Sequence, residues 1–307
     1  MQPCISQTVC AVKFERYVAK GVVAVKQTIL VVLSALLTAG AAPEVGAEEV
    51  VFPDFRGRIE EEVFAYAVLK EALARADEDY TLVKSHRPEM TNARALVELE
   101  DGRVDVVWVG TSRALERRFK PIYIPITRGL LGSRLFVIRA DRQEDFSEVE
   151  RLADLREMVA GQGTGWTDTR ILREADLEIV TASFDELFQL VSTGRIDYYP
   201  LGASEIYGFL DQYRSRYPSV TVEEDIVLVY RFDFLFFVNE ADEELHAAIH
   251  SGMLDMYEDG TYMEMYRNHP ELKPALEQAN LDSRLRLEIP NPIASEELRS
   301  IPDRFWQ

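Results

Sequence analysis

The chain has 307 residues, of which 47% are hydrophobic, and its formal net charge at pH 7 is −19. This is the composition of a globular protein, and the length allows one large or two ordinary domains. So acidic a chain excludes a protein that binds nucleic acid through a basic surface, and we expect no nucleic-acid partner.

Residues 1–47 have the features of a secretory signal peptide. Lys20 and Lys26 precede an apolar run at 29–37, and small residues follow that run. The run is about half of the ~20 residues that a membrane-spanning helix needs, so the pattern favours a cleaved leader over a permanent anchor. We expect cleavage before Glu48 and a periplasmic location.

Both cysteines of the chain, Cys4 and Cys10, lie in this leader. The mature protein is therefore expected to have no disulfide, no catalytic thiolate and no cysteine-bound zinc. The leader has four basic and two acidic residues, a net charge of +2, so the mature chain carries −19 − 2 = −21.

From residue 50 onward, helices and strands are predicted to alternate. Hydrophobic and β-branched runs predict strands at 50–55, 80–85 and 104–110, and helical spacing predicts helices at 60–76 and 91–102. Such alternation is typical of a mainly parallel sheet flanked by helices, with ligands bound beyond the carboxyl ends of the strands.

The same order returns at about residues 140–225, after a strand predicted at 130–141. A long apolar run at 226–239, bent near residues 231–233, has the pattern of a strand that crosses back to the first half. Two helices broken at Asp259–Gly260 follow at 241–268, and the proline-rich remainder predicts a short helix at 271–280 and an irregular tail.

One motif occurs twice, at a constant separation of 92 positions. Each copy reads G-R-x-D-x-x-x-x-G-x-S and stands where a helix is expected to turn into a strand; the residues are Gly102, Arg103, Asp105, Gly110 and Ser112, then Gly194, Arg195, Asp197, Gly202 and Ser204. Coincidence between two exposed turns is one interpretation. The other is two similar lobes, each of which brings the end of an equivalent strand to a shared cleft.

Five segments in this order resemble the periplasmic solute-binding proteins of ABC transporters, polar amino acid type (bacterial extracellular solute-binding family 3), over residues 50–268. They are the segment from Leu99 to Asp105, the turn with Thr111, Ser112 and Arg117, the strand Gly132–Val137, the loop Ala160–Thr164, and Asp259–Tyr262. The loop AGQGTGWTDT at 160–169 is similar to that of a less studied branch of the family.

The resemblance implies a two-lobed α/β fold, the type II periplasmic-binding-protein fold. Each lobe would hold a mixed, mainly parallel sheet flanked by helices, with two hinge strands between the lobes. The expected first lobe is discontinuous, 48–134 and 235–307, and includes the C-terminal tail. The second lobe is 135–234.

The resemblance also implies a ligand site between the lobes. Arg117 has the position of the arginine that binds a ligand carboxylate through two parallel hydrogen bonds, and Arg113 is the alternative. The glycine loop would bring backbone N–H groups to an anion. The full set of expected ligand-binding residues is Phe55, Thr111, Ser112, Arg117, Gly163, Thr164, Trp166, Asp168, Thr169, Tyr199 and Glu205.

One position departs from the family pattern. The aspartate that holds a ligand's ammonium group falls near Leu201 or Gly202, and no carboxylate stands there. Glu205 or Asp168 are the possible substitutes. The expected solute is accordingly an amino acid or a small carboxylate without an amino group.

Aromatic residues are candidates for the cleft walls. Trp166, beside glycines, is the better candidate, whereas Trp108 is expected in the core because alternate strand residues point to opposite faces. His246 and His250 share a helix face but lack a metal-binding motif, so we expect a polar stripe there, with no metal and no cofactor.

Taken together, the sequence predicts a monomeric periplasmic protein that closes two lobes over a small polar solute and delivers it to the membrane permease of an ABC transporter. No catalytic triad or nucleophile motif is present, and no catalytic residue is expected. Two alternatives remain, namely a lyase or dehydratase on the same scaffold, and a ligand sensor for a membrane signalling partner.

Overall fold

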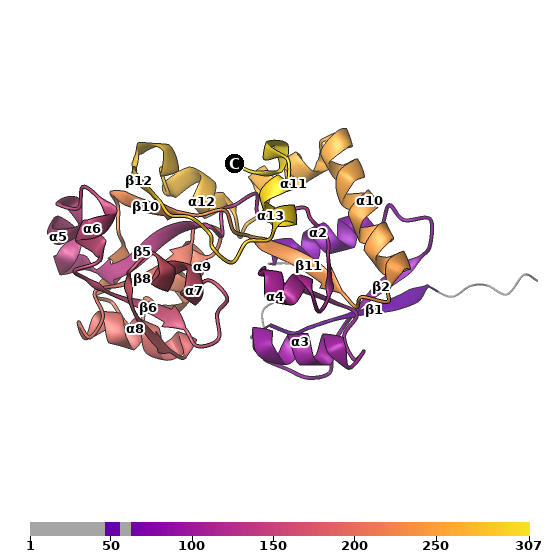
Figure 1. The fold of residues 1–307 in the computed structure, drawn as a ribbon, viewed down its shortest axis with the longest axis horizontal. Coiled ribbons are helices and arrows are strands. Elements are labelled where there is room, and N and C mark those ends of the chain that lie inside the picture. Colours follow the sequence, from indigo (N-terminus) through magenta and orange to yellow (C-terminus); the bar gives the residue numbers. More distant parts are fainter. Residues whose placement is uncertain (1–46, 56–62) are drawn as a thin grey trace, which may run out of the picture. The chain divides into compact units, whose positions relative to one another are not determined.

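Three sheets organise the part of the chain that the computed structural model describes, residues 47–55 and 63–307 (Figure 1). The predicted leader, except Ala47, and both cysteines lie outside these residues. In the first sheet, β1 (Glu48–Phe52) and β2 (Tyr80–Lys84) pair in parallel. In the small sheet, β11 (Phe234–Val238) runs antiparallel between β3 (Val106–Gly110) and β4 (Lys120–Pro121).

The large sheet has the strand order β12-β10-β5-β8-β6-β7, with β9 also on β5. Parallel pairs join β6 to β7 and β8, and β10 to β12, while β5 pairs antiparallel with β8, β9 and β10. The strands are β5 (Ser133–Arg139), β6 (Val159–Gly163), β7 (Glu178–Ala182), β8 (Tyr198–Gly202), β9 (Val220–Val222), β10 (Ile226–Val229) and β12 (Leu285–Glu288). The predicted mixed α/β architecture is confirmed.

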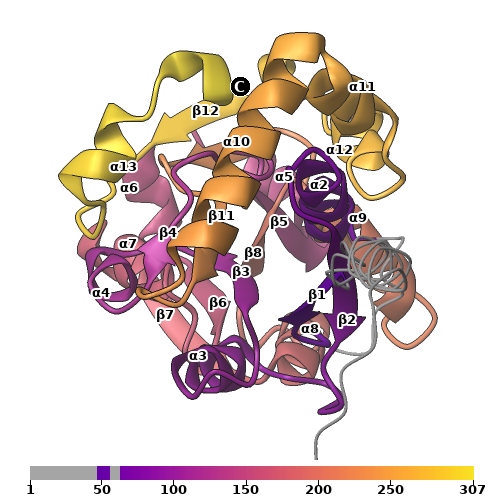
Figure 2. The ribbon, with the colours of Figure 1, turned by 90° about the vertical axis from the view of Figure 1, so that its right-hand side faces the viewer.

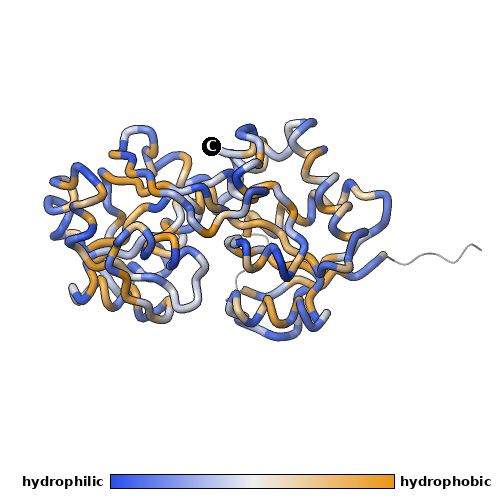
Figure 3. The backbone as a smooth tube through the Cα atoms, in the orientation of Figure 1, coloured by the Kyte–Doolittle hydropathy of each residue, from blue (hydrophilic) through white to orange (hydrophobic). Residues whose placement is uncertain are grey.

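Helices connect and cover these sheets. In chain order the main ones are α2 (Phe64–Leu73), α3 (Asn92–Glu100), α4 (Arg113–Glu116), α5 (Gln143–Ser147), α6 (Leu152–Leu155), α7 (Thr169–Glu174), α8 (Phe184–Ser192), α9 (Ile206–Tyr213), α10 (Glu243–Asp259), α11 (Thr261–Asn268), α12 (Lys273–Gln278) and α13 (Glu296–Ser300). In Figure 3, hydrophobic residues follow the inner strands and hydrophilic residues the outer turns, as burial of apolar surface requires.

Local side-chain chemistry explains where several helices begin and end. The Thr91 hydroxyl accepts the backbone N–H of Arg94 at 3.3 Å and starts α3, and Asp242 starts α10 in the same way. Gly260, at φ 85°, separates α10 from α11, where the sequence predicts the break. α10 packs on α2, and Figure 2 shows the two helices side by side.

The two copies of the repeated motif adopt the same local structure. Gly102 and Gly194 have φ angles of 67° and 68°, values that favour glycine. The carboxylates of Asp105 and Asp197 each accept a backbone N–H from another strand or its start, from Val51 at 2.7 Å and Val159 at 2.8 Å. Each copy leads into a fully buried strand, β3 or β8.

The predicted apolar run at 226–239 is divided between two sheets. β10 belongs to the large sheet and β11 to the small sheet, and residues 230–233 connect them, so the predicted bend is confirmed. The C-terminal segment differs from expectation. Its strand β12 joins the large sheet beside β10, whereas the predicted boundaries assigned all of 235–307 to the first lobe.

Candidate functional site

A cavity of about 120 Å³, here called the inner cavity, lies where the ends of β3, β5 and β11 meet the loops before α7 and α9. Gly110 of the first motif copy and Ser204 at the end of the second line it, whereas Ser112, the counterpart of Ser204, does not. Its walls include six aromatic side chains, namely Phe55, Trp108, Trp166, Phe209, Phe232 and Phe234.

A buried polar network forms one side of the inner cavity. Arg134, at the start of β5, is 2% exposed, and its Nε donates to the Tyr230 hydroxyl at 2.7 Å. Its Nη2 donates to Asp168 Oδ2 at 2.5 Å, and the Tyr230 hydroxyl donates to the same oxygen at 2.7 Å. A buried guanidinium is costly unless it is paired in this way, so Asp168 and Tyr230 hold Arg134 in place.

The network shifts the titration of its members. Burial by itself lowers the pKa of Arg134, but the adjacent Asp168 carboxylate raises it, and the net result is above the ordinary value. Burial raises the pKa of Tyr230 well above its ordinary value. Arg134 is therefore charged and Tyr230 neutral at any physiological pH, and the guanidinium also lies 5.6 Å and 5.8 Å from the ring centroids of Tyr230 and Phe232.

Asp233 organises the turn that borders the cavity at Thr127. Its side chain is fully buried and accepts the backbone N–H groups of Thr127, Gly129 and Phe234 at 3.0, 2.7 and 2.8 Å. It also accepts the Thr127 hydroxyl at 2.6 Å. Burial raises the pKa of Asp233 to about 6, although these hydrogen bonds oppose the shift.

Ser204, which lines the inner cavity, has a buried hydroxyl group. It is 4% exposed, and within the described part of the chain its Oγ has no hydrogen-bond partner. A buried hydroxyl without a partner is costly, so a ligand that bonds to it regains that energy.

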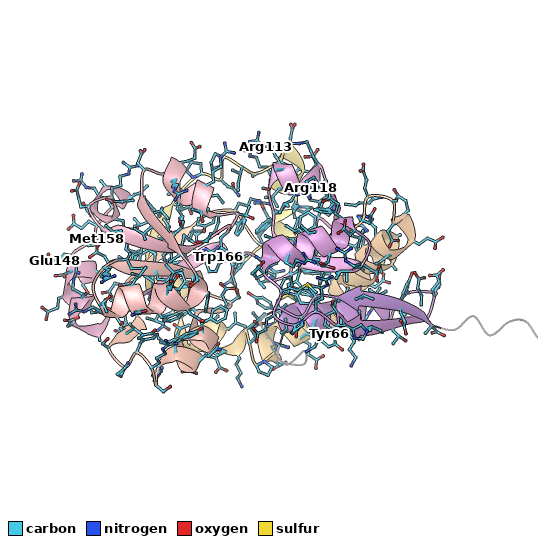
Figure 4. All side chains as sticks on the ribbon, turned by 90° about the horizontal axis from the view of Figure 1, so that it is seen from below. Tyr66, Arg113, Arg118, Glu148, Met158 and Trp166 are labelled. Atoms are coloured by element: carbon cyan, nitrogen blue, oxygen red, sulfur yellow. The ribbon has the colours of Figure 1, made fainter. Side chains whose placement is uncertain are left out.

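Four of the expected site residues line the inner cavity, namely Phe55, Trp166, Asp168 and Glu205. Trp166, labelled in Figure 4, comes from the loop between β6 and α7 and stacks on Tyr199 with ring centroids 6.1 Å apart. Trp108 was expected in the core. It is 8% exposed, which agrees, but it also contributes to the cavity wall.

Ser112 and Arg117 line a different cavity of about 500 Å³, here called the outer cavity. Two residues, Asn92 and Thr167, line both cavities, so the two adjoin. Arg113 also lines the outer cavity but is engaged, because its Nε donates to the Ala294 carbonyl at 2.9 Å and its Nη2 to the Pro292 carbonyl at 2.6 Å.

The other five expected residues line neither cavity. The Thr111 hydroxyl donates to Glu116 Oε1 at 2.7 Å, and Thr164 is exposed. Gly163 lies beneath the Trp166 indole, where an added Cβ would come within 2.2 Å of the ring, so glycine is needed for packing. Thr169 and Tyr199 are buried.

Sequence reasoning missed Arg134, Thr127 and Asp233 as parts of this region, whereas Ser204 belongs to the repeated motif that was expected at the cleft. A signal was present, because Arg134 and Asp233 are charged residues inside largely apolar runs. A charge that must be buried needs a partner, and such pairs gather around functional cavities.

The described residues contain no helix long and apolar enough to cross a membrane. Nor do residues 47–55 and 63–307 bring three or more His, Cys, Asp or Glu side chains together as metal ligands. His246 and His250 stack with ring centroids 6.1 Å apart on α10.

No family model matches the chain, and no curated protein matches its sequence. Many solved structures share its fold. A Streptococcus pneumoniae amino acid ABC transporter substrate-binding protein bound to L-arginine is 10% identical, with a TM-score of 0.53 and coverage of 72% of this chain and 93% of that one. The chain has the fold of these binding proteins.

Two further neighbours have other functional associations. An ancestral amino acid-binding protein, a precursor of cyclohexadienyl dehydratase, is 15% identical with a TM-score of 0.51, over 72% of this chain and 94% of that one. A histidine kinase sensor domain similar to periplasmic binding proteins is 14% identical with a TM-score of 0.53, over 73% of this chain and 96% of that one. At these identities the likeness concerns the fold.

Proposed function

We propose that this protein is a periplasmic solute-binding protein that encloses a small polar solute, an amino acid or a small carboxylate, and delivers it to the permease of an ABC transporter. The observation that carries the proposal is the inner cavity. Its wall combines six aromatic rings with a rigid Arg134–Asp168 pair and an unpartnered buried hydroxyl on Ser204. Concave sites with apolar walls and a few fixed polar groups are typical of small-molecule binding.

The connections between the sheets support a hinge mechanism. β5 and the β10–β11 connection lie beside the cavity, at the two predicted hinge segments. A solute that contacts both motif ends would stabilise the closed state relative to the open one, which is what drives closure. In this proposal the protein is a monomer with lobes at about 48–134 with 235–307, and 135–234, except that β12 of the C-terminal segment joins the sheet of the second lobe. Residues 1–47 are its cleaved signal peptide.

The fold neighbours support delivery to a transporter, because a bacterial amino acid ABC transporter binding protein shares the fold. A sensor role is the second candidate, since a histidine kinase sensor domain matches with the same TM-score. In both roles the protein binds its solute without changing it. A dehydratase, by contrast, would convert its solute.

The test is a thermal-shift screen of the purified protein against amino acids and small carboxylates. At a solute concentration 100 times Kd, binding adds about 2.7 kcal/mol, which for a protein of this size raises Tm by roughly 5–10 °C. We expect one chemical class to give this shift and to be recovered unchanged after incubation. Conversion of the solute would establish the enzyme instead, and a library without any stabilising member would refute the proposal.

A further inference from the structure

We propose that the solute is an amphipathic anion, in which a compact apolar group of the size of a benzene ring fills the inner cavity and a carboxylate or phosphate lies among the arginines of the outer cavity. This inference rests on the proposed function, because it names the chemical class of ligand for the same cleft. Three observations carry it, namely the arginines of the outer cavity, the six aromatic rings among the residues that line the inner cavity, and the residues that the two cavities share.

The outer cavity is a positive site on an acidic protein. Three arginines line it, Arg113 from α4, Arg117 directly after α4 and Arg170 from α7, and no carboxylate is among its lining residues. The chain as a whole carries −19. Three guanidinium groups in a cavity without a lining carboxylate favour the binding of an anion. A guanidinium group can bind a carboxylate or phosphate through two parallel hydrogen bonds.

The three arginines of the outer cavity differ in how far their side chains are already bonded within the protein. Arg113 donates to two backbone carbonyls, which hold the side chain but leave its positive charge uncompensated. Within residues 47–55 and 63–307, Arg117 makes no hydrogen bond or ion pair. The Arg170 side chain is 71% exposed and forms a long ion pair with Glu174, at 3.7 Å. Arg117 and Arg170 are therefore the groups that bind the anionic head.

The inner cavity is suited to the apolar part of the solute. Its one guanidinium, Arg134, is already paired with Asp168. The Glu205 charge adds to the field that raises the pKa of Arg134, and Glu271 accepts the backbone N–H of Phe64 at 2.6 Å. A further buried charge would need its own partner, whereas an apolar group gains from burial among six aromatic rings.

The dimensions agree with one molecule across both cavities. The inner cavity, at about 120 Å³, is close to the cavity of about 150 Å³ that holds benzene in an engineered protein of another fold. Asn92 and Thr167 line both cavities, so an apolar group in one and a charged group in the other can belong to a single small solute.

Isothermal titration calorimetry with five probes tests the proposal. The probes 3-phenylpropionate and phenyl phosphate have a ring and an anion, acetate and inorganic phosphate have the anion alone, and benzylamine has a ring and a cation. We expect the two aryl anions to bind at least tenfold more tightly than the matching simple anions, and benzylamine to bind no better than acetate.

Single substitutions test which side chains bind the anion and which bind the ring of the probes. Arg117→Ala and Arg170→Ala should each weaken the aryl anions about tenfold or more, as expected for a lost charge-assisted hydrogen bond. Arg173→Ala, an exposed arginine of α7 that lines neither cavity, is the matched control and should change nothing. Phe55→Ala should reduce the preference for aryl anions over simple anions.

Two results would overturn the inference while leaving the proposed function intact. One is a stabilising solute from the library whose affinity is the same in Arg170→Ala and in the unchanged protein. The other is tighter binding of benzylamine than of either aryl anion. Failure of the whole solute library would instead remove the proposed function and this inference together.

Discussion

Replacement of Asp233 by asparagine tests whether the buried turn beside the inner cavity depends on a carboxylate. Each carboxylate oxygen accepts two hydrogen bonds, Oδ2 from the backbone N–H groups of Thr127 and Gly129, and Oδ1 from the Thr127 hydroxyl and the Phe234 N–H. Asparagine has one such oxygen, so two buried donors lose their acceptor. At about 1–3 kcal/mol for each, the variant should lose roughly 2–6 kcal/mol of unfolding free energy at pH 7, where the carboxylate is ionised.

The loss should depend on pH because the pKa of Asp233 is raised to about 6 by burial. The folded protein then holds the proton more tightly than the unfolded chain, whose aspartate has its ordinary pKa of 3.8. The resulting stabilisation is present below about pH 4 and is lost as the pH rises to about 6. The interval between 3.8 and about 6 corresponds to about 3 kcal/mol, at about 1.4 kcal/mol per pH unit.

Asparagine does not titrate, so the difference in unfolding free energy between the protein and Asp233→Asn should shrink by about 2.4 kcal/mol between pH 4 and pH 7, slightly less than the full value because the unfolded aspartate is already partly ionised at pH 4. Urea unfolding at pH 4, 5, 6 and 7, followed by tryptophan fluorescence, measures this difference, provided that the slope with urea is the same in both proteins. Asp211→Asn, a side chain of α9 that is 75% exposed, is the control and should differ by less than about 0.5 kcal/mol at each pH. A difference for Asp233→Asn that is constant from pH 4 to pH 7 would refute the reasoning.

Two further predictions concern packing. Gly252→Ala should lower the free energy of unfolding by about 1–3 kcal/mol in urea, because the new Cβ would lie 2.1 Å from the Ala72 carbonyl oxygen between α10 and α2. Gly208→Ala in α9, where the Cβ meets nothing within 4 Å, is the control and should raise it by about 0.5–1 kcal/mol. Equal effects of the two substitutions would contradict the packing argument. Phe305→Ala should lower the free energy of unfolding by about 3–5 kcal/mol, because Phe305 is 4% exposed and packs edge-on against Tyr257 with ring centroids 4.8 Å apart. An unchanged unfolding midpoint would show that Phe305 does not anchor the C-terminal segment.

The amino-acid sequence by itself determined the elements and the repeated turn, because these depend on neighbours along the chain. Hydrophobic periodicity placed β3 and β8, and the glycines at 102 and 194 marked the left-handed turn that precedes each strand. Gly260 marked the break between α10 and α11 for the same reason. The carboxylates of Asp105 and Asp197 belong to this local motif, so their spacing was informative before any fold was known.

The tertiary structure decided which charged side chains are buried and what they face. Arg117 and Arg134 are both arginines close to a strand end in the sequence, yet the first lines the outer cavity and the second is paired inside the inner one. That difference depends on Asp168 and Tyr230, which lie 34 and 96 positions from Arg134. Likewise β12 joins β10 across 59 positions, from Ile226 to Leu285. Desolvation and long-range pairing are properties of the packed chain, and no local pattern of residues contains them.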